Sequence, residues 1–323
     1  MAIDLLSLEP QQISRNLRGK MALVYGQAGC GKTTLASKFE KPLICAFERG
    51  SNALHNIYVA PVKTWQDWRG MVKQLCSKSE LQEKYYTLAI DTVDEAYKLC
   101  EKWLCNQHGV DTIKDVGAFG SGYKMLDAEF MNGFRDLAFA GYGLLFISHE
   151  TEKPYNDDNG KEYNKIIPAL PNRPFQLINK MVDLIGYIRN IPIQNGEETE
   201  YKRFMFFRSD ERFLTKSRFK YITPRIELDY NEFVNAIYNA IDEEVKHSGG
   251  EATEDVNPFV ERSFEEAMDE AKTIWGQIVA EDRQGEALAI LETVFGKPTK
   301  FSEVLPEQIN ELNTVLNKIK ALV

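Results

Sequence analysis

Residues 26–33 read Gly26-Gln27-Ala28-Gly29-Cys30-Gly31-Lys32-Thr33. This octapeptide fits the pattern G-x-x-x-x-G-K-[ST] and directly follows an apolar run at residues 21–25. Glycines let the backbone turn tightly and bring successive N–H groups against an anion, where a side chain would clash. Lys32 adds a positive charge, and Thr33 adds a hydroxyl that can bind Mg²⁺. The pattern therefore predicts a phosphate-binding P-loop between a strand and a helix, extending to Thr34.

The helix after this loop is expected from Lys32 to Phe39 and should point its positive dipole end at the bound phosphates. A P-loop in this context predicts that residues 26–34 bind the phosphates of a nucleotide together with Mg²⁺. A chance glycine-rich loop is the alternative, but the strand before it and the helix after it argue against that.

The composition is that of an ordinary globular protein with about two domains, because 43% of the 323 residues are apolar and 27% are charged. No apolar run approaches the ~20 residues needed to span a bilayer, and Asp4 interrupts any signal-peptide pattern. The five cysteines lack C-x-x-C spacing and are expected to be reduced thiols. We therefore expect a cytoplasmic protein without a membrane partner.

The net charge of −9 is unevenly distributed along the chain. Residues 246–323 contain 8 Lys and Arg against 15 Asp and Glu, whereas residues 200–225 contain 8 against 3. A local basic patch is sufficient for phosphate binding. The P-loop and these shifts in composition divide the chain into a core at residues 1–245, which is expected to be the ATPase, a flexible linker at 246–262, and an acidic helical module at 263–323.

Short apolar runs alternate with helical patterns in the core, which is typical of a mainly parallel sheet between helices, the α/β class. The expected strands are residues 21–26, 42–47, 57–62, 86–90, 144–147 and 184–189. Functional residues of such sheets lie beyond the carboxyl ends of the strands. Those ends carry Gly26, Glu48, Asp91 and His149.

The remaining core sequence predicts a long polar loop at residues 151–174 and a hairpin of residues 201–208 with 212–219. A helix at 230–245 is expected to close the core.

Asp91 ends an apolar strand downstream of the P-loop, which is the Walker B arrangement for holding Mg²⁺. A strand-ending Asp that caps the next helix is the alternative. Thr92 rather than Glu follows it, which disfavours the AAA+ helicase and chaperone pattern. Glu48 is then the candidate base that activates water, unless it merely pairs with Arg49.

His149 ends the fifth strand, where a polar side chain could sense the γ-phosphate. A capping histidine is the alternative reading.

These motifs together resemble the RecA-like recombinase fold, and more closely a phage family of short RecA-related ATPases. Its members are described as phage nucleotide-binding proteins or Sak-four-like recombinases. The resemblance covers residues 15–245 and is carried by the P-loop, Glu48, Asp91, the glycine-rich loop 116–123 and the run from Phe146 to Glu150. It implies an ATP- and Mg²⁺-dependent ATPase that forms a ring or filament and assists single-strand annealing or recombination in the cytoplasm of a phage-carrying bacterium.

The resemblance also implies a role for Lys216 and Arg218. In RecA-like filaments, a cationic pair at a strand end reaches the ATP of the neighbouring subunit. The two residues are two apart and would share one face of a strand. A solvated, charge-protected edge strand is the alternative, and the two readings stay open here.

The resemblance further implies single-stranded DNA binding by two mobile loops, at residues 109–123 and 151–174. The second loop contains aromatic residues and four cations: Lys153, Lys161, Lys165 and Arg173. Cations that follow phosphates and aromatics that stack on bases suit this partner, although Asp157, Asp158 and Glu162 dilute the charge and leave a plain solvated loop as the alternative.

The acidic module resembles helical units of phage single-strand-binding and recombination proteins and is expected to contact a single-strand-binding or annealing protein. Two other classes of function remain: a non-catalytic nucleotide-dependent switch or adaptor in phage DNA metabolism, and a small-molecule kinase. A kinase would need an Arg-rich lid and an acceptor pocket, and the sequence displays neither.

Overall fold

The computed structural model describes residues 12–50, 54–118, 120–156, 159–195, 198–253, 264–280 and 282–322. The chain forms two compact units, Met1–Val260 and Glu261–Val323. In the described part, helix α7 (Tyr230–Ser248) continues beyond residue 245, and strand β12 (Ala252–Thr253) pairs with β1 (Ile13–Ser14). Residues 254–262 of the predicted linker lie outside the described residues.

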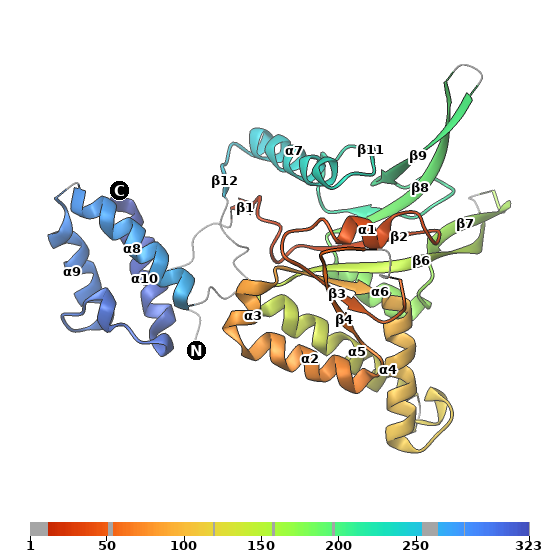
Figure 1. The fold of residues 1–323 in the computed structure, drawn as a ribbon, viewed down its shortest axis with the longest axis horizontal. Helices are drawn as coiled ribbons and strands as arrows, with labels where there is room; N and C mark the ends of the chain where they lie inside the picture. The colour runs from red at the N-terminus through yellow and green to blue at the C-terminus, as the bar shows by residue number, and fades with distance from the viewer. Residues whose placement is uncertain are drawn as a thin grey trace. The chain divides into compact units, whose positions relative to one another are not determined.

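A sheet of ten described strands forms the centre of the larger unit, in the order β11-β9-β8-β2-β6-β5-β3-β4, with β10 beside β8 and β7 beside β6 (Figure 1). The strands are β2 (Met21–Gly26), β3 (Pro42–Ala46), β4 (Tyr58–Pro61), β5 (Thr87–Asp91), β6 (Gly143–Asn156), β7 (Glu162–Pro168), β8 (Leu184–Asn195), β9 (Glu198–Phe206), β10 (Lys216–Ser217) and β11 (Arg225–Glu227). Strands β8, β2, β6, β5, β3 and β4 are mutually parallel, and β9 and β11 extend the sheet antiparallel. The predicted α/β class with a mainly parallel sheet is confirmed.

Helices cover both faces of this sheet, as Figure 1 shows. They are α1 (Lys32–Ala36), α2 (Trp65–Ser77), α3 (Ser79–Lys84), α4 (Val93–His108), α5 (Ser121–Phe139), α6 (Asn172–Met181) and α7. Successive side chains of a strand point to opposite faces. Leu23 therefore packs in the core with α2, α4 and α5, whereas Val24 packs in the core with α1 and α7. No described helix is long and apolar enough to cross a membrane.

Aromatic side chains dominate the core below α5. The ring of Phe134 is fully buried, and its centroid lies 5.2 Å from Trp68, 5.2 Å from Phe130 and 5.1 Å from Phe146. The predicted mobile loop 109–123 also packs here, because Ile113 and Val116 are buried in this core. Its Phe119 lies outside the described residues.

Two predictions about the sheet were wrong. The polar stretch at 151–174 is not an irregular loop, because β6 continues to Asn156 and pairs antiparallel with β7 as a projecting hairpin. The predicted hairpin of 201–208 with 212–219 does not form either. Strand β9 pairs with β8 on one side and with β11 on the other, while β10 pairs with β8.

The smaller unit has helices α8 (Phe264–Ala280), α9 (Gln284–Phe295) and α10 (Ile309–Ile319). They enclose their own apolar core, which includes Ile278, Leu291 and Leu316. Gly296 caps the end of α9 with a left-handed φ of +68°. This unit is helical, as the spacing of its apolar residues predicts.

Candidate nucleotide site

The P-loop connects β2 to α1 at the carboxyl edge of the sheet. Gly26, the last residue of β2, aligns with His149 on β6 and with Ile188 on β8. A methyl group at Gly26 would lie 2.4 Å from the carbonyl oxygen of Ile188, so only glycine fits at this position. Helix α1 has five residues and ends at Ala36, short of the predicted Phe39, so the helix dipole contributes less than expected.

Lys32 is held inside this loop, with 7% of its surface exposed. Its Nζ donates hydrogen bonds of 2.8 Å to the carbonyl oxygens of Gly26 and Gln27. A buried ammonium group requires such partners. Phosphate oxygens placed in the loop would exchange with these carbonyl oxygens and form stronger, charge-assisted hydrogen bonds.

Thr33, on α1, contacts Asp91, the last residue of β5. The Oγ1 atom of Thr33 donates to Oδ2 of Asp91 at 2.8 Å, and Asp91 is only 3% exposed. Burial raises the pKa of Asp91, whereas the hydrogen bond from Thr33 and the charge of Lys32 oppose that rise. A hydroxyl and a carboxylate are hard oxygen ligands of the kind that Mg²⁺ prefers.

No group of three or more His, Cys, Asp or Glu side chains that could hold a metal ion occurs in the described part of the chain. The Thr33 hydroxyl and the Asp91 carboxylate fit Mg²⁺ bound through few protein ligands, with phosphate and water oxygens as the others.

Glu48, His149 and Asp94 form a chain of polar contacts beside Asp91. The Nδ1 atom of His149 lies 2.9 Å from Oδ2 of Asp94, and the backbone N–H of His149 donates to Oδ1 of Asp94 at 3.3 Å. The Nε2 atom of His149 lies 3.6 Å from Oε1 of Glu48. The Asp94 contact orients the imidazole so that its other nitrogen faces Glu48.

Asp94 was missed from the sequence. It lies in the first turn of α4, where an acidic residue is ordinarily explained by the helix dipole. Its burial, with 6% exposed, and its two contacts with His149 become visible only when β6 and α4 are placed side by side.

The end of β3 is tied to the end of β5, which positions Glu48 over the same edge. The backbone N–H groups of Phe47 and Glu48 both donate to the carbonyl oxygen of Asp91, at 2.7 and 3.3 Å. Burial raises the pKa of the Glu48 carboxyl, and the neighbouring His149 opposes that rise. A carboxylate with a raised pKa is better suited to accept a proton than a fully solvated one.

Lys216 and Arg218 lie away from this edge. Lys216 aligns with Ile185, three residues before the Ile188 that faces Gly26, a separation of about 10 Å along the strand. Its Nζ donates to the carbonyl oxygens of Asn179 and Val182, the latter at 2.9 Å, and burial lowers its pKa.

Arg218 binds the same helix end as Lys216. Its guanidinium donates to Asp183 Oδ1 at 2.8 Å and to the carbonyl oxygen of Lys180 at 2.6 Å. Strand β10 ends at Ser217, so Arg218 lies just beyond it. Within this chain both cations bind the carboxyl end of α6 rather than the P-loop.

The β6–β7 hairpin carries three of the four cations predicted to bind nucleic acid. Lys153 aligns with Lys165, and Tyr155 aligns with Tyr163, so these four side chains lie on one face of the hairpin. Glu152 and Glu162 alternate with them and lie on the other face.

Of the other two cations, Lys161 is the third on the hairpin and Arg173 lies beyond it. Lys161 is exposed just before β7. Arg173 lies on α6, where it pairs with Asp127 at 2.5 Å and stacks on Tyr123. Asp157 and Asp158, which dilute the charge in the sequence, are outside the described residues.

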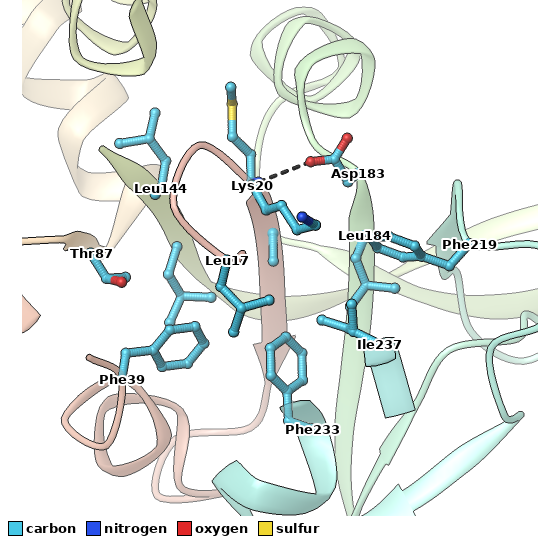
Figure 2. Close-up of a pocket in the computed structure, with 14 residues that line it drawn as sticks. Leu17, Lys20, Phe39, Thr87, Leu144, Asp183, Leu184, Phe219, Phe233 and Ile237 are labelled. Carbon is cyan, nitrogen blue, oxygen red and sulfur yellow. Dashed lines mark hydrogen bonds between the residues drawn. The ribbon is translucent and has the colours of Figure 1, made fainter. Parts of the chain in front are cut away.

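Two cavities differ in their suitability for a ligand. A groove of about 760 Å³ beside the P-loop is lined by Gln27, Cys30 and residues of β6, β7, β8 and β9. The cavity in Figure 2 lies at the opposite end of β2 and has room for about 30 Å³, between Leu17, Phe233 and other mostly apolar side chains. The dashed bond in Figure 2 joins the backbone N–H of Met21 to Asp183. A nucleotide does not fit that small cavity.

The chain resembles proteins of known sequence and structure. It is 28% identical to the SPbeta prophage-derived uncharacterized protein YorG of Bacillus subtilis (strain 168) over 335 residues, which cover 100% of this chain and 99% of that protein. The crystal structure of the flagellar accessory protein FlaH from Methanocaldococcus jannaschii aligns with 61% of this chain and 79% of that chain, at 10% identity and a TM-score of 0.33. That score is too low to support an argument.

A protein family described as an AAA domain matches residues 18–219. The expectation that Thr92 after Asp91 disfavours the AAA+ helicase and chaperone pattern stays a prediction, because the matched description names only an AAA domain. The matched region contains the P-loop, Glu48, Asp91 and His149, the residues that the structure brings to one edge of the sheet. By this match over more than half of its length, the chain belongs to the AAA domain family.

Proposed function

We propose that this protein is an ATP- and Mg²⁺-dependent ATPase that binds single-stranded DNA and acts as a homo-oligomer in phage recombination or annealing. One observation carries the ATPase part: β2, β3 and β5 end at a single edge of the sheet and bring Lys32, Glu48 and Asp91 there, with Thr33 already in contact with Asp91. Phosphate binding, metal binding and proton acceptance are thus available within one site.

Each residue has a distinct task in this proposal. Lys32 binds the β- and γ-phosphate oxygens, and Thr33 and Asp91 hold Mg²⁺, which neutralises charge that develops on the phosphoryl oxygens when it is bound. Glu48 orients the attacking water and accepts its proton. His149, fixed by Asp94, contacts Glu48 and senses the γ-phosphate.

The proposed DNA contact is the face of the β6–β7 hairpin that carries Lys153, Tyr155, Tyr163 and Lys165. Its two ammonium groups suit the phosphates, and its two rings suit bases that stack without sequence preference. The alternation that places Glu152 and Glu162 on the other face supports this assignment.

The wider context of the proposal comes from the relatives and the resemblance. The similarity to a prophage-derived protein supports a phage-encoded role in the bacterial cytoplasm. We further propose that Lys216 and Arg218 act on the ATP of a neighbouring subunit in a ring or filament. This requires both side chains to give up their hydrogen bonds to the carboxyl end of α6. The acidic module, poorly suited to phosphate, is proposed to contact a single-strand-binding or annealing protein.

Turnover of ATP by the purified chain tests the ATPase part. The rate is measured with and without Mg²⁺ and single-stranded DNA, in wild type, Lys32→Ala, Glu48→Gln and the exposed control Lys38→Ala. We expect Lys32→Ala to abolish turnover and Lys38→Ala to preserve it. If Lys32→Ala turns ATP over at the wild-type rate, the ATPase proposal is refuted.

Glu48→Gln separates an enzyme from a nucleotide switch. An ATPase should keep ATP affinity and lose about 10²–10⁴-fold in rate, the usual contribution of a positioned base. Wild-type protein that binds ATP without turning it over under any condition favours the switch or adaptor.

DNA binding is tested by the anisotropy of a labelled single-stranded oligonucleotide across a salt series. Removing two phosphate contacts with Lys153→Gln and Lys165→Gln should reduce the slope of log K against log salt by about 1.4, at roughly 0.7 per contact. The matched control, Lys98→Gln with Lys102→Gln on α4, removes the same charge elsewhere. Equal effects of the two pairs would contradict a specific hairpin contact.

A further inference from the structure

Arg203 of β9 lies directly against the P-loop. A methyl group at Gly31 would be 3.3 Å from Nη1 of Arg203 and 3.1 Å from Cδ2 of Leu228, so both side chains cover the loop residue that precedes Lys32. The backbone holds this pair in register, because the N–H of Leu228 donates to the carbonyl oxygen of Arg203 at 2.8 Å.

The strand pairing fixes which face Arg203 occupies. Met205, two residues further along β9, is buried in the core with α1 and α7, so Arg203 projects from that same face, above the P-loop helix. Arg203 aligns with Asn190, two residues beyond the Ile188 that faces Gly26. Its guanidinium is thereby placed at the carboxyl edge, where the nucleotide is proposed to lie.

The order of the strands indicates which way a bound triphosphate runs along the edge of the sheet. Strands β6 and β5 flank β2 on one side, and the contact between Thr33 and Asp91 places the metal end of the triphosphate there. Strands β8 and β9 flank β2 on the other side. A triphosphate whose β- and γ-phosphates are directed towards Asp91 has its α-phosphate and nucleoside on the side where Arg203 lies.

The guanidinium of Arg203 forms no hydrogen bond or ion pair with any residue in the described part of the chain. The adjacent Lys202, in contrast, pairs with Glu227 at 3.5 Å. Guanidinium binds phosphate oxygens through two parallel N–H groups, and such charge-assisted bonds are stronger than neutral ones.

We propose that Arg203 binds the α-phosphate of a nucleoside di- or triphosphate in its own subunit. This inference rests on the proposed nucleotide site and adds to it a cation that comes from outside the P-loop. Because the α-phosphate is common to all nucleotides, Arg203 contributes affinity without discriminating between bases.

Calorimetric titration with ADP and CDP tests the proposal without requiring hydrolysis. We expect Arg203→Gln to weaken both ligands by about tenfold or more, and by the same factor, which is the usual scale for a lost hydrogen bond to a charged group. Arg203→Lys should retain part of the affinity. Arg225→Gln, which removes an exposed guanidinium from β11 that stacks on Phe204, is the matched control and should bind like wild type. Thermal melts establish that each variant is folded.

Three results would overturn this assignment: unchanged affinity in Arg203→Gln, a loss that differs between ADP and CDP, or an equal loss in Arg225→Gln. Wild-type protein that binds neither nucleotide refutes the nucleotide site itself and Arg203 with it. Wild-type binding that survives Arg203→Gln unchanged refutes Arg203 alone.

Discussion

The hydrogen bond between Thr33 and Asp91 has an effect on stability that can be measured without any ligand. Thr33→Val keeps the shape of the side chain and removes the hydroxyl that donates to Asp91 at 2.8 Å. The Asp91 carboxylate, 3% exposed, then loses this donor. A hydrogen bond to a charged group contributes about 1.5–3 kcal/mol, so we expect the free energy of unfolding to fall by about that amount.

The expected loss depends on pH in a defined direction. The Thr33 hydrogen bond favours the ionised form of Asp91 and lowers its pKa, against the larger effect of burial. Its contribution is therefore present while Asp91 is ionised and is lost as pH falls through the pKa of Asp91. The difference between wild type and Thr33→Val should shrink in acid.

Urea unfolding followed by tryptophan fluorescence is the assay. Trp275 belongs to the smaller unit, so a Trp275→Phe background leaves Trp65, Trp68 and Trp103 to report on the larger one. With a slope of about 3 kcal/mol/M, the midpoint should shift by about 0.5–1 M. Thr33→Ser, which retains the hydroxyl, is the control.

A double-mutant cycle with Asp91→Asn isolates the charged contact. We expect Thr33→Val to cost less in the Asp91→Asn background than in wild type. If Thr33→Val is as stable as Thr33→Ser, or costs as much in the Asn background, the reasoning about this contact is refuted.

Three further predictions concern the site and the core. Burial raises the pKa of Glu48 above its ordinary 4.5, so the rate of hydrolysis should decline with falling pH at a midpoint above that value. A pH–rate profile checks this. If Glu48→Gln shows the same decline in acid, the decline belongs to another group. Gly26→Ala places a methyl group 2.4 Å from the carbonyl oxygen of Ile188, so nucleotide binding should be lost in calorimetric titrations; wild-type affinity would contradict the tight fit. Phe134→Ala should destabilise the larger unit by about 3–5 kcal/mol in urea unfolding, and a cost below about 1 kcal/mol would mean that this aromatic core is loosely packed.

The edge of the sheet could be predicted from the sequence because each strand ends with a recognisable signal. An apolar run followed by Gly26, Glu48 or Asp91 marks where β2, β3 and β5 end, whereas the expectation that His149 ends its strand was wrong, because β6 continues to Asn156. The parallel register then aligns Gly26 with His149, and Ala46 with Asp91. These predictions depend only on residues that are neighbours in the chain, so they do not require knowledge of which distant segments pack together.

The projecting hairpins could not be predicted in the same way. Both faces of the β6–β7 hairpin are largely solvated, so the segment from Thr151 to Tyr155 lacks the apolar alternation that identifies a strand. The outer part of β8, from Asn190 to Gln194, mixes polar residues with Ile and Pro and is exposed or half-buried, so the sequence did not reveal its pairing with β9 and residues 201–208 were given the wrong partner. Asp94 and Arg203 were missed because their contacts join segments far apart in the chain.

Strand β6 offers a physical basis for stimulation of hydrolysis by DNA. It carries His149, which contacts Glu48, and four residues later Lys153 on the proposed DNA-binding face, about 13 Å away along one continuous strand. The hairpin then leads into α6, whose carboxyl end is bound by Lys216 and Arg218. If the proposed DNA contact moves this strand, we expect His149 to move relative to Glu48. In an oligomer where Lys216 and Arg218 bind a neighbouring subunit's nucleotide, their hydrogen bonds to the carboxyl end of α6 would be lost. Helix α6 follows β6 and β7 in the chain. The two proposed stimuli, DNA and a neighbouring subunit, therefore act on one stretch of chain that begins in the nucleotide site.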